Sequence, residues 1–334
     1  VLGYNTLFGG YVMNKKSIAV LTSGGDAPGM NAAVRAVGRS GISNGMRVIG
    51  IRRGYNGLIN GDMFELNLRS VSDSIHRGGT ILYTARCPEF KEEKGFEKAV
   101  KACKDLGLSG VVVIGGDGSF KGASKLSHAG IPCIGIPGTI DNDIQCSEYT
   151  VGFDTAMNTV MQMVDRIRDT AQSHDRCSVV EVMGRRCGDI ALHTGIAVGA
   201  TAVLVPEVEY NFERDIIKRI QFTQMTGKKH FIIIVAEGIG GVNEMAKEIQ
   251  KRTGIESRAT ILGHVQRGGS PTVRDRVVAS EMGDRAVKLL SDGKTNRVIA
   301  MQNGKIVDFD ITEALNMKKK FNIELYETAL RISI

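Results

Sequence analysis

The sequence predicts a doubly wound α/β protein with mostly parallel sheets, and three observations support this fold class. Short runs rich in β-branched residues alternate with longer helical patterns along almost the whole chain. The short runs are continuously apolar, as in strands that helices cover on both faces. The chain has 334 residues, of which 42% are hydrophobic, and this length suggests about two domains of roughly 100–200 residues. We therefore expect two three-layer α/β/α domains.

The elements follow one another in a regular order. Strands are expected at residues 17–22, 47–51, 111–114, 133–136, 178–182, 202–205, 231–236 and 259–262. Helices are expected near residues 30–43, 93–106, 119–129, 154–172, 189–198, 213–224, 243–253 and 274–291. Because no low-complexity segment or linker interrupts this order, we expect one compact body.

The positive charge of the chain raises the question of nucleic-acid binding. The net charge is +7, but no run of five or more basic residues exists and aromatic residues make up only 5% of the chain. The arginines stand singly or in pairs beside glycine-rich turns. This distribution favours pockets for small phosphorylated anions, since guanidinium offers phosphate a planar bidentate fork. We expect neither a nucleic-acid nor a membrane partner.

Cysteine usage and apolar run length bear on the compartment. The six cysteines lie far apart without metal-type spacing, which favours ordinary thiols in a reducing cytoplasm. The longest apolar runs, such as residues 231–236, have the length of a strand and are too short to span a membrane. Residues 1–12 lack the features of a signal peptide, so we expect a disordered N-terminal extension before Met13.

Chemically informative residues follow five of the predicted strands directly. In open parallel sheets, ligands bind beyond the carboxyl ends of the strands. The five segments are TSGGDAPG (22–29), IGGDGS (114–119), PGTIDND (137–143), VMGRRCGD (182–189) and GHVQRGGSP (263–271).

Two of these segments predict a phosphate site. Gly24 and Gly25 form a glycine-rich turn before a helix that begins near Met30. Residues 115–119 form a second glycine-rich turn of this kind, with Asp117 at its centre. Free amides at a helix N-terminus bind anions, whereas Asp117 would repel phosphate unless Mg²⁺ lies between them. Neither turn has the spacing of a P-loop or of a dinucleotide site. Plain chain reversal, with Asp117 as a helix cap, is the alternative for each turn alone.

A pair of carboxylates follows the strand at 133–136. Asp141 and Asp143 could divide proton transfer and charge stabilisation in phosphoryl transfer, and Thr139 could donate a hydroxyl. Taken alone, Asp141 and Asp143 are better explained as solvated turn residues. Charged residues in or beside strand-end turns favour the catalytic interpretation, because together they describe a site for a phosphate donor and a phosphorylated acceptor. They are Arg86, Arg176, Arg185, Glu237, Arg258, His264 and Arg267.

These motifs resemble those of the bacterial ATP-dependent 6-phosphofructokinase family, over residues 13 to about 325. The segments TSGGDAPGMNAAVR (22–35), IGGDGS, PGTIDNDI, SVVEVMGRRCGD (178–189) and ATILGHVQRGGSP (259–271) carry the resemblance. It implies two Rossmann-like domains with the active site in the cleft between them. The ATP-binding domain would comprise residues 13–152 plus 266–315, and the fructose 6-phosphate-binding domain residues 153–265 plus 316–334. The implied glycolytic reaction transfers the γ-phosphate of ATP to the 1-hydroxyl of fructose 6-phosphate with Mg²⁺.

The resemblance also implies roles for individual residues. Asp141 would be the base, assisted by Asp143, Thr139 and Arg185, and Asp117 would bind the metal. The ATP-contacting positions are Gly25, Tyr55, Arg86, Cys87, Gly116, Asp117, Gly118, Ser119 and Gly122. The fructose 6-phosphate positions are Thr139, Asp141, Arg176, Met183, Gly184, Arg185, Glu237, Arg258, His264 and Arg267. Arg176 and Arg258 would reach the sugar phosphate of a neighbouring subunit, which implies a homotetramer.

Individual residues at the donor and effector sites bear on which phosphate donor and which effector anion the chain binds. Pyrophosphate-dependent relatives carry an aspartate at Gly118 and a lysine at Gly138, so ATP is expected here. A pyrophosphate-dependent enzyme and a non-catalytic phosphosugar-binding regulator are the alternatives. Cys87, Lys91 and Phe96 depart from the family at the nucleotide site, and Leu68 and Thr201 depart from it at the effector site. We therefore expect weakened ADP activation, with the phosphoenolpyruvate response retained. The expected effector wall is Arg35, Arg39, Arg168, Lys228, Lys229 and His230.

Overall fold

The computed structural model describes residues 16–333, so the extension expected at residues 1–12 lies outside the described part. The strands are β1 (Ser17–Thr22), β2 (Arg47–Ile51), β3 (Met63–Leu66), β4 (Leu108–Gly115), β5 (Cys133–Pro137), β6 (Cys177–Val182), β7 (Ala202–Leu204), β8 (Phe231–Ala236), β9 (Ser257–Ile261), β10 (Arg297–Gln302) and β11 (Lys305–Asp310). The helices are α1 (Met30–Ser43), α2 (Tyr55–Asn60), α3 (Glu93–Asp105), α4 (Asp117–His128), α5 (Phe153–Ser173), α6 (Asp189–Ala197), α7 (Lys218–Met225), α8 (Val242–Thr253), α9 (Val273–Ser291), α10 (Ile311–Asn316) and α11 (Ile323–Ile332). Three single turns of other helix types are η1 (Pro88–Lys91), η2 (Glu213–Ile217) and η3 (Gly263–Arg267).

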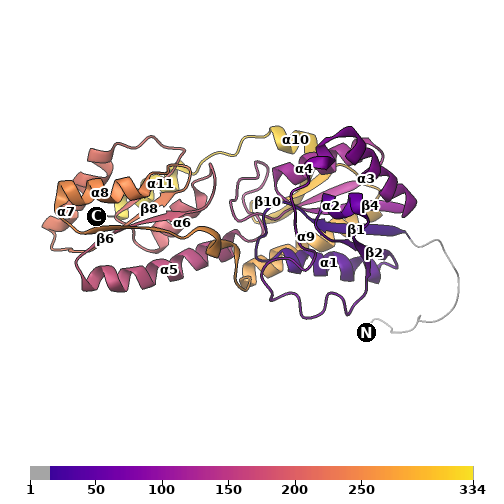
Figure 1. The fold of residues 1–334 in the computed structure, drawn as a ribbon, viewed down its shortest axis with the longest axis horizontal. Helices are drawn as coiled ribbons and strands as arrows, with labels where there is room; N and C mark the ends of the chain where they lie inside the picture. Colours follow the sequence, from indigo (N-terminus) through magenta and orange to yellow (C-terminus); the bar gives the residue numbers. More distant parts are fainter. Residues whose placement is uncertain (1–15, 334) are drawn as a thin grey trace.

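A seven-stranded sheet with the order β11-β10-β5-β4-β1-β2-β3 forms the first domain (Figure 1). Its central strands are parallel, while the edge strands β3 and β11 pair antiparallel with their neighbours. Ile18 and Val20 of β1 pack in the cluster that contains α1 and α9, whereas Ala19 and Leu21 pack in the cluster that contains α2, α3 and α4. Because successive side chains of a strand point to opposite faces, a continuous apolar run fills both layers.

A four-stranded parallel sheet with the order β7-β8-β6-β9 forms the second domain. The same alternation holds for β8, where Ile232 and Ile234 face α5, α6 and α11 in a continuation of the cluster that contains α1 and α9. Ile233 and Val235 face the cluster that contains α7 and α8. The expected fold class, two α/β/α domains with mostly parallel sheets, is therefore confirmed.

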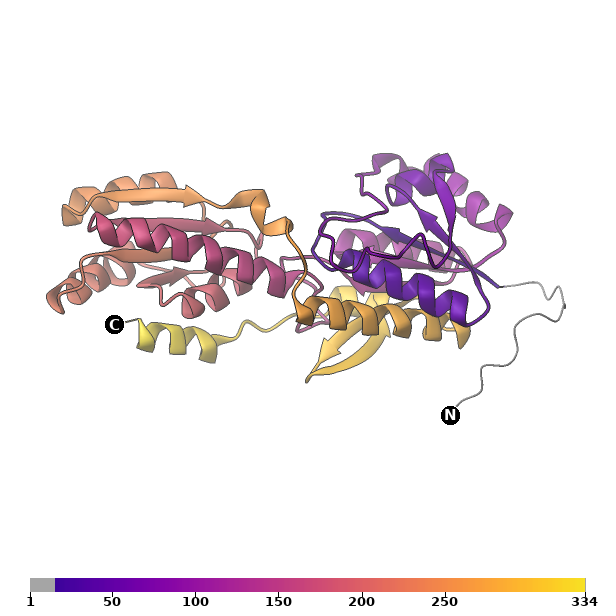
Figure 2. The same ribbon diagram turned by 90° about the horizontal axis from the view of Figure 1, so that it is seen from below.

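The two domains lie end to end (Figures 1 and 2), so the expectation of one compact body is wrong. Each sheet has both faces covered by its own helices, and no sheet face remains for packing against the other domain. The chain passes between the domains three times, at residues 138–152 after β5, 262–272 after β9 and 317–322 after α10. We call these segments the first, second and third crossings. The domain limits given above fall near them and stay a prediction.

The expected strands and helices agree closely with those in the structure. The helix expected near 213–224 divides into a single π-helical turn, η2, followed by α7. Six elements had not been expected: β3, β10, β11, α2, α10 and α11. The edge strands β3 and β11 are only partly buried and carry polar residues, which hides the apolar pattern of a buried strand. Within residues 16–333, no helix is long and apolar enough to cross a membrane.

Candidate active site

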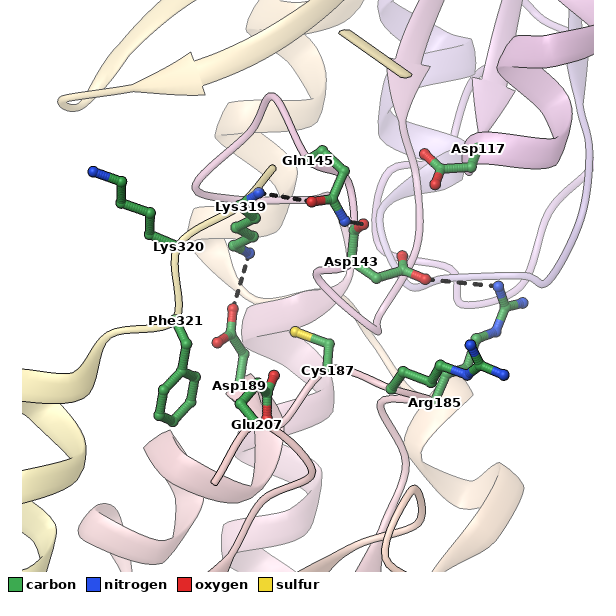
Figure 3. Close-up of a pocket in the computed structure, with 11 residues that line it drawn as sticks. Asp117, Asp143, Gln145, Arg185, Cys187, Asp189, Glu207, Lys319, Lys320 and Phe321 are labelled. Carbon is green, nitrogen blue, oxygen red and sulfur yellow. Dashed lines mark hydrogen bonds and ion pairs between the residues drawn. The ribbon is translucent and has the colours of Figure 1, made fainter. Parts of the chain in front are cut away.

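The carboxyl ends of β1, β4 and β5 face those of β6 and β8 across the cleft between the domains. Two adjoining cavities open there, with volumes of about 740 Å³ and about 420 Å³. Asp117, Asp143 and Arg185 line both of them, and Figure 3 shows these three residues around the smaller cavity. The strand-end segments singled out in the sequence therefore meet at one place, as the strand-end rule predicts.

Asp141 is the most deeply buried carboxylate of the cleft. Its side chain is 0% exposed, and no group among residues 16–333 donates a hydrogen bond to either of its oxygens. Arg185 Nε lies 3.1 Å from Asp141 Oδ2, and Arg267 Nη2 lies 3.9 Å from Oδ1. Burial and the nearby Asp143 raise the pKa of Asp141, while Arg267 and Arg185 oppose the rise. The result is a carboxylate with unused acceptor capacity that two cations hold in place.

Asp143 and Arg185 face each other across the domain boundary. Arg185 Nη1 lies 3.7 Å from Asp143 Oδ2 (Figure 3). Burial raises the pKa of Asp143, and Arg185 opposes the rise. The guanidinium of Arg185 thus contacts the carboxylates of both Asp141 and Asp143. It can stabilise negative charge that develops on a reacting group between them.

The backbone at Arg185 is held in an uncommon conformation. Arg185 has φ 54°, in the left-handed region, and Gly184 has φ 134°. Glu237 Oε1 accepts hydrogen bonds from the amides of both residues, at 2.5 Å from Arg185 and 3.1 Å from Gly184. Glu237 therefore supports the loop that carries Arg185, a role that sequence reasoning had not assigned to it.

All nine expected ATP-contacting residues line the larger cavity. They are Gly25, Tyr55, Arg86, Cys87, Gly116, Asp117, Gly118, Ser119 and Gly122. Some of their polar groups already have partners within the chain: Ser119 Oγ donates to the Ser23 carbonyl, and the Tyr55 hydroxyl donates to the Ser119 carbonyl. The Tyr55 ring stacks on Phe90, with centroids 4.1 Å apart. Phe90, Lys121 and Lys125 line the same cavity and were missed in the sequence.

Two glycines that line this cavity lie close to the side chain of another residue. A Cβ at Gly25 would lie 2.6 Å from Arg267 Nη1, and a Cβ at Gly122 would lie 2.7 Å from Tyr55 Cζ. A Cβ at Gly118, in contrast, would meet no atom within 4 Å. Packing against the buried Tyr55 ring therefore explains Gly122, whereas the Arg267 side chain could move away from a Cβ at Gly25. The open space beside Gly118 belongs to the cavity.

Asp117 begins α4 and is the candidate metal ligand. Burial raises its pKa, and Lys121 and Arg185 oppose the rise. Among the described residues, no group of three or more His, Cys, Asp or Glu side chains could hold a metal ion. A single carboxylate beside a cavity of this size fits Mg²⁺, which is commonly bound by one or two carboxylates together with substrate phosphates and water.

The expected sugar-phosphate residues fall into two groups. Thr139, Asp141, Met183, Gly184, Arg185, Glu237, His264 and Arg267 lie on the loops and strand ends at the cleft. Arg176 and Arg258 lie at the opposite end of the second sheet, immediately before β6 and at the start of β9. Glu256 pairs with both: its oxygens lie 2.9 Å from Arg176 Nε and 2.6 Å from Arg258 Nη2. One chain therefore does not bring these two arginines to its own cleft.

The expected effector residues also divide between the domains. Arg35 and Arg39 belong to α1 of the first domain, whereas Arg168 of α5 and residues 228–230 before β8 belong to the second. Burial lowers the pKa of His230, and the positive charges of Lys228 and Arg168 lower it further. Arg168, Lys228 and His230 thus form one basic cluster in the second domain, which Arg35 and Arg39 of the first domain of the same chain do not join.

A buried aspartate joins α9 to the first crossing and to the start of α5, and it was missed in the sequence. Asp275, near the start of α9, accepts hydrogen bonds from the Tyr149 hydroxyl and from the Gly152 amide at 2.7 Å. It also accepts bonds from the amide and hydroxyl of Thr155 in the first turn of α5. Asp275 follows no strand, so the strand-end rule could not find it; only the packing of α9 against the start of α5 reveals it.

The fold and the cleft define a two-domain α/β phosphotransferase. A profile of the phosphofructokinase family matches residues 17–290. The ATP-dependent 6-phosphofructokinases of Clostridium botulinum and Clostridium novyi are each 58% identical to this chain over 318 residues, covering 95% of this chain and 99% of theirs. The chain belongs to the phosphofructokinase family.

Solved structures show the same fold. The phosphofructokinase of Saccharomyces cerevisiae matches with a TM-score of 0.90 at 34% identity. That match covers 95% of this chain and 50% of the yeast chain, so this chain spans half its length. A pyrophosphate-dependent phosphofructokinase of Marinobacter aquaeolei matches with a TM-score of 0.82 at 20% identity and supports the fold alone.

Proposed function

We propose that this chain transfers the γ-phosphate of ATP to the 1-hydroxyl of fructose 6-phosphate, giving fructose 1,6-bisphosphate and ADP. One observation carries the proposal: the fully buried Asp141 has no hydrogen-bond donor among residues 16–333 and lies between Arg185 and Arg267 beside the large cavity. A carboxylate of this kind can accept the proton of an attacking hydroxyl. The 58% identity to ATP-dependent 6-phosphofructokinases supports the same reaction.

In the proposed mechanism, Asp141 accepts the proton of the 1-hydroxyl as its oxygen attacks the γ-phosphorus. Arg185 and Arg86 stabilise the charge that spreads over the transferred group. Asp117 would hold Mg²⁺, which would supply positive charge to the phosphates of the donor. Thr139 supports the base, since its hydroxyl oxygen accepts a hydrogen bond from the Asp141 amide at 3.2 Å.

Space around two glycines favours ATP over pyrophosphate as the donor. Gly118 is open, which leaves room for the nucleotide beyond its terminal phosphates. A Cβ at Gly138 would lie 2.9 Å from Ile114 Cγ2 and 3.1 Å from Met30 Cε. Both neighbours are fully buried, so a lysine at residue 138 would require the core to shift.

The assembly and regulation belong to the same proposal. Arg176 and Arg258 would bind the sugar phosphate of a neighbouring subunit in a homotetramer, and their position away from the chain's own cleft supports this. The cationic cluster of Arg168, Lys228 and His230 would meet Arg35 and Arg39 of another subunit to bind an effector anion. We place the enzyme in glycolysis in the cytoplasm.

A coupled assay with ATP, GTP and pyrophosphate as donors tests the proposed function. With ATP, Asp141→Ser should lower kcat by roughly 10²–10⁴-fold while leaving fructose 6-phosphate binding largely intact. Asp105→Ser, at an exposed position on α3, is the matched control and should retain full activity. A pyrophosphate preference would identify the first alternative. If no donor gives sugar bisphosphate while fructose 6-phosphate still binds, the non-catalytic regulator remains.

A further inference from the structure

The residue between the two site carboxylates is itself held from several directions. Asn142 lies in the left-handed region with φ 52° and is 2% exposed. Asparagine tolerates this conformation better than most residues, but it still needs support from its surroundings. Because the conformation of Asn142 fixes how the chain leaves Asp141 and enters Asp143, it also sets where the two carboxylates point.

Asp189 and Lys319 supply much of this support. Asn142 Nδ2 donates to Asp189 Oδ2 at 2.7 Å, and Lys319 Nζ donates to the Asn142 carbonyl at 2.5 Å. Lys319 Nζ also lies 2.9 Å from Asp189 Oδ2 (Figure 3). With the two bonds to Asn142, this contact closes a ring of three residues. We call Asn142, Asp189 and Lys319 the Asn142 clamp.

A second contact extends the clamp to Asp143. The Lys319 amide donates to Gln145 Oε1 at 2.6 Å, and Gln145 Nε2 donates to the Asp143 carbonyl at 3.2 Å (Figure 3). The backbone carbonyls of Asn142 and Asp143 are therefore both tied, directly or through one side chain, to Lys319.

The members of the clamp come from three separate parts of the chain. Asn142 lies on the first crossing, and Lys319 lies on the third. Asp189 is the first residue of α6 in the second domain, four residues after Arg185. The clamp therefore couples the loop of Asp141 and Asp143 to the loop of Arg185, and a change in the relation of the two domains would strain it.

The negative charge of Asp189 and the positive charge of Lys319 balance each other within the clamp. The side chains of Asp189 and Lys319 are 11% and 20% exposed, so the pair is shielded from solvent. Without the ammonium group, the Asp189 carboxylate keeps the side-chain amide of Asn142 as its one partner among residues 16–333, and the Asn142 carbonyl loses a donor. A buried ion that loses its partner is strongly destabilised, and the loop should relax to separate these groups.

We propose that Asp189 and Lys319 are positioning residues that keep Asn142 in the left-handed conformation and so aim Asp141 and Asp143 at Arg185 and the substrate hydroxyl. This proposal rests on the phosphofructokinase activity proposed above. The pair lies in the wall of the smaller cavity and acts on the reaction through Asp141. Small displacements of a base suffice for large rate losses, because proton transfer needs hydrogen-bond geometry.

Lys319→Met tests the proposal, with Lys318→Met as the matched control on the exposed neighbouring residue. We expect kcat to fall by roughly 10–100-fold in Lys319→Met, with the KM values for ATP and fructose 6-phosphate within about 3-fold of the parent. Lys319→Arg should recover most of the rate, and Lys318→Met should match the parent. A kcat within 2-fold of the parent in Lys319→Met overturns the proposal.

The double variant with Asp141→Ser separates positioning from plain stabilisation. If Lys319 acts through Asp141, adding Lys319→Met to Asp141→Ser should lower the remaining rate by less than about 3-fold. The same loss in both backgrounds would mean that Lys319 does not act through the base and would reject the proposal. Full turnover in Asp141→Ser alone would instead reject Asp141 as the base, whereas a parent enzyme that forms no sugar bisphosphate with any donor would reject the proposed function. If Lys319→Met does not fold, Asp189→Asn carries the same test with the same expected losses.

Discussion

Replacing Gly118 by aspartate tests whether the open space beside Asp117 is occupied by a nucleotide phosphate. Gly118 is the second residue of α4 and is exposed, and a Cβ there would meet no atom within 4 Å. The fold should accept the substitution without strain. An acidic residue in the first turn of a helix even stabilises it by about 0.3–1 kcal/mol. The melting temperature of Gly118→Asp should therefore equal or slightly exceed that of the parent.

The affinity of Gly118→Asp for ATP should be lower than that of the parent. Two unit charges at about 5 Å repel by roughly 3 kcal/mol at an effective dielectric constant of about 20. Solvent at this exposed position screens the repulsion, so we expect about 1.5–3 kcal/mol. Because each 1.4 kcal/mol corresponds to about tenfold in affinity, the KM for ATP should rise roughly 10–100-fold.

Steady-state kinetics with varied ATP, together with thermal melting, measure both effects. Gly118→Asn is the control because it has nearly the same shape without the charge, and its KM for ATP should rise by no more than about 3-fold. Equal increases in the two variants would show that size rather than charge matters. If neither variant changes the KM for ATP, the larger cavity is not the nucleotide site.

Three further predictions follow from the site and the crossings. Asp141 must be ionised to accept a proton, so activity is lost as pH falls through its raised pKa. The negative charge of Asp143 raises this pKa and the positive charge of Arg267 lowers it. Asp143→Asn should therefore move the acid limb of the pH–rate profile to lower pH, and Arg267→Gln should move it to higher pH. Shifts in the same direction would contradict Asp141 as the base. Asp275→Ala should lower the free energy of unfolding by about 3 kcal/mol or more in denaturant titrations, because four donors lose a buried acceptor; a loss below 1 kcal/mol would refute the reasoning. ADP should activate only weakly at subsaturating fructose 6-phosphate, since by the family resemblance Thr201 replaces a glutamate that helps hold the effector's magnesium. Strong ADP activation would disprove this.

The apolar pattern of the sequence predicted strand bounds best where the strand is buried on both faces. The bounds expected for β1, β2 and β8 agree with the structure, because each is a continuous apolar run that fills both faces of a sheet. β3 and β11 were missed because an edge strand is only half covered and can carry polar residues. The clustering of Gly25, Asp117 and Arg185 was predictable for a similar reason, since strand ends of parallel sheets converge on one cleft.

The sequence by itself determined the α/β class, the strand-end motifs and, through its resemblance to a family, the site residues that now line the cleft. It did not determine that the two domains lie end to end, that Asp275 ties α9 to the first crossing, or that Lys319 ties the third crossing to the first. Those contacts join residues far apart in the chain, such as Asn142 and Lys319, and no local pattern marks either partner. Their role arises from burial and hydrogen bonding between crossings, which exist only after the two sheets have formed.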